Sequence, residues 1–139
     1  MKIKTLGLAA AAALLAATFA TQMAPAQPAD AGDDDAAIAA AVSAGGPLFD
    51  RNCSACHGTS GQGGAGPALA GNDFVSSRTA LVTQILLGEL DHGMPAFGPI
   101  LDDEEIAAIA TYVRNSWGNA FGLVPADTVA RLRASAAGD

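Results

Sequence analysis

Both cysteines of this 139-residue chain, and one of its two histidines, lie in the sequence Cys-Ser-Ala-Cys-His at 53–57. A disulfide between Cys53 and Cys56 would close a loop too small to stabilise the fold much, and it would leave His57 without a role. A thioredoxin-like redox pair requires a βαβ pattern, which the sequence lacks. A zinc site requires four Cys or His ligands, and outside this motif only His92 remains. Covalent attachment of a haem through both thiols, with the adjacent histidine as an axial iron ligand, explains all three residues at once.

The segment after this motif, residues 58–72, is rich in glycine and carries too few apolar side chains to bury its own backbone. A loop of this kind inside a compact domain normally carries a function or surrounds a ligand. Only 5% of the residues are aromatic although 50% are hydrophobic, so large core-filling side chains are scarce. The composition therefore favours a core that packs around a bulky group.

A haem iron bound by His57 needs a second axial ligand or an open site. Met94 is the candidate, because a thioether is a soft ligand that suits haem iron and raises the reduction potential relative to two histidines. A methionine is more often flexible core filler. Here Gly93 and Pro95 flank it and indicate a loop rather than a helix interior. His92 is the alternative distal ligand.

Residues 1–26 have the features of a secretory signal peptide. Lys2 and Lys4 precede an apolar run, and small residues then allow cleavage after Ala20 or Ala26. The run is shorter than the ~20 residues of a spanning helix, so no stable membrane insertion is expected after cleavage. The mature protein is expected in the periplasm.

Three further segments are expected. Residues 27–43 contain three consecutive aspartates and are expected to form a flexible acidic linker, with at most a short helix over 36–42. Residues 44–118 are expected to fold as one domain, and 119–139 to form a C-terminal extension with an amphipathic helix over 126–136. The formal net charge of −7 becomes more negative when the leader and its lysines are removed, and no basic stripe remains. Nucleic acid is therefore not an expected partner.

The apolar pattern of the domain is helical throughout. One strongly apolar helix is predicted over 80–87, and another begins after Asp102 or Asp103, with Glu104 and Glu105 in its first turn. A stripe along the second helix is expected to be buried, formed by Ile106, Ile109, Ala110, Val113 and Trp117. No alternating strand pattern occurs. The predicted fold class is all-α, with three to five helices and long loops.

The sequences CSACH, GAGPAL and GMPAFGPILDDEEIAAIATYVRNSWG resemble class I c-type cytochromes, over about residues 44–118. The resemblance implies a compact cytochrome c domain whose helices and long loops wrap around one covalently bound haem c. In this family an early helix bearing Gly and Phe crosses a late helix bearing an aromatic residue. Gly45, Phe49, Ile109 and Tyr112 stand at the matching positions.

The resemblance also assigns roles around the haem. Pro67 matches the proline whose carbonyl oxygen accepts a hydrogen bond from the ligand histidine. That bond would fix the histidine tautomer and raise its basicity. Trp117 could bond a haem propionate or pack the helix end. Arg51, Arg78 and Arg114 are candidate propionate partners, although exposed arginines are usually only solvated.

A His/Met iron has no vacant position, so the expected function is one-electron transfer without enzymatic catalysis. The expected partner is a redox protein, either a dehydrogenase, a reductase or an oxidase. Residues 112–133 resemble the tails of small cytochromes associated with dehydrogenases and oxidase chains. Two alternatives remain: a haem-bearing subunit of a dehydrogenase complex, or a haem sensor or peroxidase-like protein whose Met94 dissociates.

Overall fold

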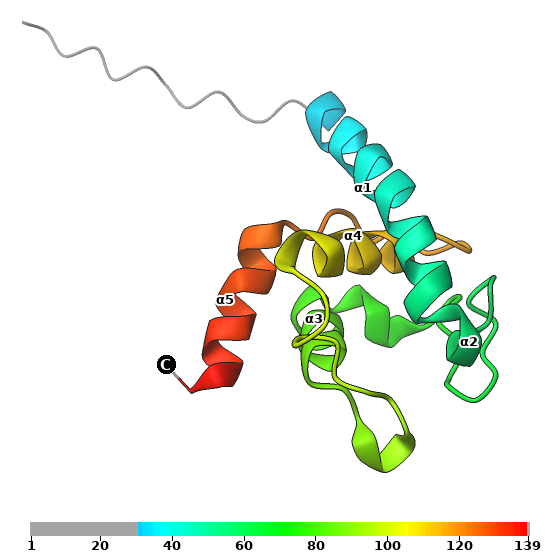
Figure 1. The fold of residues 1–139 in the computed structure, drawn as a ribbon. Helices are drawn as coiled ribbons and strands as arrows, with labels where there is room; N and C mark the ends of the chain where they lie inside the picture. The colour runs from blue at the N-terminus through cyan, green and yellow to red at the C-terminus, as the bar shows by residue number, and fades with distance from the viewer. Residues whose placement is uncertain (1–30, 139) are drawn as a thin grey trace, which may run out of the picture.

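The computed structural model describes residues 31–138. The expected signal peptide and the first residues of the expected linker lie outside this range. Five α-helices and two short 3-10 helices follow in chain order: α1 (Ala31–Asn52), α2 (Ser54–His57), η1 (Asp73–Ser76), α3 (Arg78–Leu87), η2 (Leu90–His92), α4 (Asp103–Arg114) and α5 (Ala126–Ala137). Within the described range the only extended pairing is an isolated bridge between Glu89 and Met94. The prediction of an all-helical domain with long loops is confirmed (Figure 1).

The second half of α1 crosses α4, and this crossing organises the domain (Figure 1). Gly45 lies at the contact, where a β-carbon would stand 2.1 Å from the carbonyl oxygen of Ala108. Phe49, one turn further, is fully buried, and its ring centroid is 5.4 Å from that of Tyr112. The glycine thus lets two backbones approach closely and the aromatic pair fills the space beside it. The helix crossing expected from the resemblance is present.

This crossing provides a matched pair of glycine substitutions. Gly45→Ala is expected to destabilise the protein by about 1–3 kcal/mol, because the new methyl group meets backbone atoms of α4 that cannot move aside alone. Gly46→Ala places its methyl group 3.4 Å from the Tyr112 ring and gains helix propensity, so it should change stability by less than about 1 kcal/mol. Chemical denaturation of both variants measures the difference. Equal stabilities would contradict the close approach at Gly45.

Helix α4 begins with the expected cap. The side chain of Asp102 accepts a hydrogen bond from the Glu105 amide at 2.8 Å, and the Glu105 side chain accepts one from the Asp102 amide at 3.1 Å. This reciprocal capping box satisfies two amides that the helix itself leaves unpaired. The core-facing residues of α4 are buried as predicted: Ile106, Ile109, Ala110 and Val113.

The end of α4 differs from the sequence prediction. The helix stops at Arg114 rather than continuing to Trp117, which has a positive φ of 55°. Asn115 explains the early stop: its side chain donates to the Thr111 carbonyl at 2.7 Å and accepts from the Gly122 amide at 3.0 Å. These bonds turn the chain back toward α4 in place of another helical turn.

The expected flexible linker also differs from the structure in the residues that are described. Residues 31–43 belong to α1, so the helix is much longer than the short segment expected over 36–42. Alanine, the strongest helix former, fills most of 36–41. Asp34 and Asp35 lie near the helix start, where the helix dipole favours negative charge. Helix propensity therefore outweighs the solvation of the acidic run.

No helix in residues 31–138 is both long and apolar enough to cross a bilayer. Helix α5 forms where it was expected and packs against α3 and α4. Its apolar side buries Val129 completely and Leu132 in part.

Candidate functional site

The Cys-x-x-Cys-His motif consists of Cys53, which lies between α1 and α2, and the four residues of α2, at the right of Figure 1. The Cys53 amide donates to the Phe49 carbonyl at 2.8 Å, and the His57 amide donates to the Cys53 carbonyl at 3.0 Å. Both thiols are free: Cys53 packs against the core, and Cys56 is exposed. Burial, with a smaller contribution from Cys56, raises the pKa of Cys53 to about 11. The helical turn holds the two thiols and the imidazole as one rigid group.

His57 is buried, with 9% of its surface exposed. Its Nδ1 atom lies 2.8 Å from the carbonyl oxygen of Pro67. A carbonyl only accepts, so Nδ1 must carry the proton and donate it, which leaves the Nε2 lone pair free to bind a metal. A β-carbon at Gly66 would stand 2.9 Å from the His57 ring, so the loop backbone lies directly against the imidazole. The hydrogen bond expected from the resemblance is therefore present.

The glycine-rich loop over 58–72 folds back onto the motif. The Gly63 amide donates to the His57 carbonyl at 2.7 Å, and the Gly66 amide donates to the Cys56 carbonyl at 2.9 Å. These bonds explain how a loop with few apolar side chains is held in place, since its backbone polar groups are paired with the motif.

Met94 lies on the loop between α3 and α4. Its backbone pairs with Glu89, whose amide donates to the Met94 carbonyl at 2.8 Å and whose carbonyl accepts from the Met94 amide at 3.0 Å. The half-buried side chain packs against the core, and the Gln84 side-chain amide is 3.8 Å from its sulfur. The sequence analysis did not single out Gln84, which lies between Thr83 and the apolar end of α3. The loop thus presents the thioether at a defined position.

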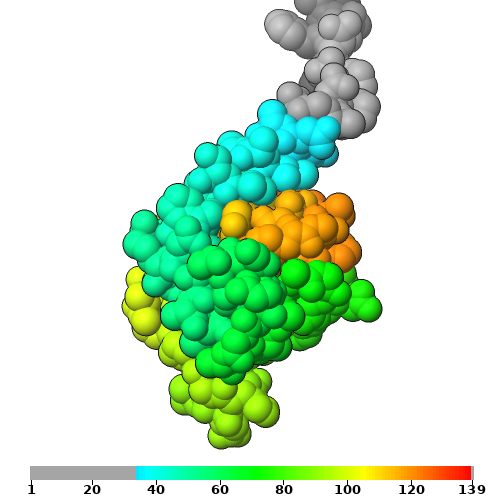
Figure 2. Space-filling view, turned by 90° about the vertical axis from the view of Figure 1, so that its right-hand side faces the viewer, coloured from blue at the N-terminus to red at the C-terminus, as the bar shows by residue number. Residues whose placement is uncertain are grey.

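His92, the alternative distal ligand, lies in a different environment. Its side chain is 82% exposed, and Nδ1 lies 3.6 Å from the Glu89 carboxylate. This segment around η2 forms the lobe at the bottom of Figure 2. A side chain directed into solvent is a poorer candidate for a buried iron than a thioether packed on the core, so the geometry favours Met94.

Residues 40–113 match the family described as cytochrome C oxidase, cbb3-type, subunit III. The match covers more than half of the chain. The chain belongs to this family of c-type cytochromes.

Individual relatives agree with this assignment. The cytochrome is 39% identical over 106 residues to the fructose dehydrogenase cytochrome subunit of Gluconobacter japonicus, covering 65% of this chain and 22% of the relative. It is 36% identical over 88 residues to a cbb3-type cytochrome c oxidase subunit CcoP of Azospirillum brasilense, covering 58% and 30% respectively. It is also 33% identical over 85 residues to cytochrome c6 of Gracilaria tenuistipitata var. liui, covering 59% of this chain and 79% of that protein. The chain therefore spans less than a third of these dehydrogenase and oxidase subunits but most of the small cytochrome.

Arg114 has a structural position in the cytochrome that the sequence did not indicate. Only 4% of it is exposed, and its guanidinium donates to the carbonyl oxygens of Val75 at 2.7 Å and Ser76 at 2.6 Å. The same group donates to the carbonyls of Phe121 and Gly122. The interpretation of Arg114 as a solvated arginine is therefore wrong, because the side chain is buried and four of its five N–H donors are bonded to backbone carbonyls.

Arg51 and Arg78 are exposed, as expected of solvated arginines. Burial lowers the pKa of Arg114, and the positive charge of Arg78 lowers it further.

Trp117 contacts the helix crossing of the cytochrome, with its ring centroid 5.1 Å from that of Phe49 and 5.3 Å from that of Tyr112. This contact corresponds to packing at the helix end, one of its two expected roles.

Two surface pockets of the cytochrome, of about 420 and 350 Å³, lie where α5 faces the 96–103 segment. None of the five candidate site residues lines them. These pockets are therefore separate from the thiols, imidazole and thioether described above.

Proposed function

We propose that this cytochrome is an exported, periplasmic one-electron carrier. One haem c is bonded covalently through Cys53 and Cys56, with His57 and Met94 as the axial ligands. It moves electrons between a dehydrogenase or respiratory complex and an acceptor. Family membership supports electron transfer as the general function, because c-type cytochromes carry haem c for that purpose.

The observation that carries this proposal is the pairing of His57 with Pro67 beside two free thiols. The donor set fits a haem c: two unpaired cysteines on one helical turn, a buried imidazole whose Nε2 is free, and a half-buried thioether on a separate loop. The carbonyl of Pro67 keeps the imidazole in the correct tautomer and makes it a stronger ligand.

Each residue then has a specific task. The haem supplies an iron that changes between the ferric and ferrous states. His57 and Met94 would hold the iron, and with both bound no position would be left for a substrate on the metal. The apolar core against which Met94 and Cys53 pack lowers the local dielectric and favours the less charged, reduced state. A partner redox protein then only needs to approach the group closely, without binding to the iron.

A second candidate function has support from the relatives. Two of them are named as the cytochrome subunits of fructose dehydrogenase and of quinone alcohol dehydrogenase, the latter from Gluconobacter oxydans and 31% identical over 126 residues. The chain would then serve as a fixed haem-bearing subunit of a dehydrogenase complex rather than as a free carrier. The same axial ligands serve both functions, so the partner is the only difference.

The absorption spectrum of the reduced holoprotein, with and without carbon monoxide, tests the ligand set. We expect no spectral change on addition of CO, because Met94 fills the sixth position. The control is a haem protein with a known open site under the same conditions. A rapid spectral shift to a CO complex would instead favour the sensor or peroxidase-like alternative, in which the methionine is labile.

A further inference from the structure

The segment that follows Met94 is fixed to α3 on one side. The Phe97 amide donates to the Ile85 carbonyl at 3.0 Å, and the Gly98 amide donates to the Leu86 carbonyl at 3.1 Å. A β-carbon at Gly98 would stand 2.9 Å from the Leu86 carbonyl oxygen, so the backbone of this loop lies in close contact with the end of α3. These bonds form the C-terminal anchor of the Met94 loop.

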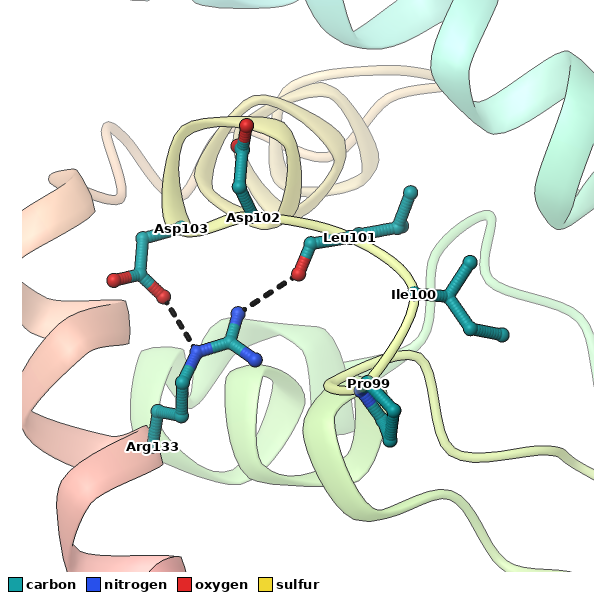
Figure 3. A pocket seen from close by; sticks show the side chains of 6 residues that line it. All are labelled: Pro99, Ile100, Leu101, Asp102, Asp103 and Arg133. Atoms are coloured by element: carbon teal, nitrogen blue, oxygen red, sulfur yellow. Dashed lines mark hydrogen bonds and ion pairs between the residues drawn. The ribbon is translucent and has the colours of Figure 1, made fainter.

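Arg133, on α5, contacts the chain just after this anchor, beside Leu101 and Asp103 (Figure 3). Its Nε donates to the Asp103 carboxylate at 2.8 Å, and one terminal nitrogen donates to the Leu101 carbonyl at 2.9 Å. The other terminal nitrogen donates to the Gly98 carbonyl. One planar group therefore fixes three points along residues 98–103, and the rigid fork of a guanidinium is suited to such a task.

Helix α5 has packing contacts of its own besides these bonds. Val129 is fully buried, Leu132 is partly buried, and the helix packs against both α3 and α4. The Arg133 bonds therefore matter most for residues 98–102, which form no helix before α4 begins at Asp103. Arg133 also lies outside the family match, which ends at residue 113.

We propose that Arg133 is a positioning residue for the distal ligand. It fixes the chain four residues after Met94 and so keeps the thioether at the iron. The inference rests on the proposed function, since it requires Met94 to be the sixth ligand. Met94 also keeps its backbone pairing with Glu89 on the N-terminal side and the bonds to α3 on the C-terminal side, so Arg133 is one of three attachments of this segment. Loss of Arg133 should loosen the ligand rather than remove it.

The test compares Arg133→Gln, Arg133→Lys and Arg131→Gln in the full-length holoprotein. Arg131 is the matched control, because it lies on the same helix and its side chain bonds only exposed groups of that helix, the Asp127 carboxylate and the Thr128 hydroxyl. The readouts are the near-infrared sulfur-to-iron band and the rate at which CO binds the reduced protein, which reports dissociation of Met94. Thermal unfolding of each variant measures stability separately.

In Arg133→Gln we expect CO to bind about tenfold faster, since charged hydrogen bonds of this kind hold the anchor, and the sulfur-to-iron band to weaken. Arg133→Lys should behave in the same way, because one ammonium cannot bond all three acceptors. Arg131→Gln should match wild type. If Arg133→Gln fails to fold, Asp103→Ala removes one of the three bonds and should show a smaller increase in the CO rate.

The possible failures are distinguishable. If wild-type protein has the sulfur-to-iron band and Arg133→Gln keeps the wild-type band and CO rate, the positioning role is wrong and the proposed function stands. If Arg133→Lys keeps the wild-type rate of CO binding while Arg133→Gln does not, a positive charge alone is sufficient. That result would overturn the inference that the three bonds of the guanidinium position the ligand. If wild-type protein lacks the band, both the inference and the proposed distal ligand are wrong.

Discussion

Replacing Met94 by alanine is expected to remove the sulfur-to-iron band, lower the reduction potential and open the reduced iron to CO. Methionine stabilises the ferrous state relative to harder ligands, and the axial ligands together control potentials over a span of ~0.8 V. The reduction potential of Met94→Ala should therefore be lower than that of wild type by a part of this ~0.8 V range that a redox titration can measure. Spectroscopic redox titration and CO binding to the holoprotein measure both effects.

His92→Ala is the matched control for the Met94 experiment. The His92 side chain is exposed and two residues from Met94, so its loss should leave the spectrum and the potential close to those of wild type. The opposite pattern, an unchanged spectrum in Met94→Ala and a changed one in His92→Ala, would transfer the distal role to the histidine.

Changing Cys53 and Cys56 together to alanine is expected to abolish covalent haem attachment. Each thiol is free in the structure, and no other cysteine occurs in the chain that could replace them. Acid-acetone extraction should then remove all haem from the polypeptide, whereas wild-type protein should retain it. Haem-stained gels and the mass of the intact protein measure attachment directly.

The single cysteine variants separate attachment from folding. Cys53 packs against the core and Cys56 is exposed, so Cys53→Ala should reduce stability more than Cys56→Ala, although each removes one thioether bond. A double variant that still holds haem after extraction would contradict covalent attachment. The double variant Cys53→Ser with Cys56→Ser repeats the attachment test with side chains closer in shape to cysteine.

The parts of the fold that the sequence predicted are those determined locally. Helix α4 has a capping box and a buried stripe whose spacing can be read along the chain, and both are present. The pairing of His57 with Pro67 spans only ten residues, and the resemblance placed both correctly. Short sequence separation and distinctive residue types made these features predictable.

The features that could not be predicted depend on distant backbone. The carbonyls that Arg114 contacts include those of Val75 and Ser76, 39 and 38 residues away, and any residue type supplies a carbonyl. Arg133 presents the same difficulty, because two of its three acceptors are carbonyls more than thirty residues away. An arginine in an amphipathic helix therefore gives no indication that it is bonded to a loop far along the chain.

The buried contacts of the α4 end also determine what unfolds together. Besides the bonds from Arg114 to Phe121 and Gly122, the Thr111 hydroxyl accepts from the Val124 amide at 3.0 Å, and Asn119 donates to the Val113 carbonyl at 2.9 Å. These bonds all cross residue 118, the expected border between the haem domain and the C-terminal extension. Residues 119–124 thus belong to the same cooperative unit as α4, and their amide protons should exchange with solvent only when that helix opens. If a protease cut after Trp117 and the two pieces separated, the Val113 carbonyl and part of the Arg114 guanidinium would lose their partners, so the pieces should not remain folded independently.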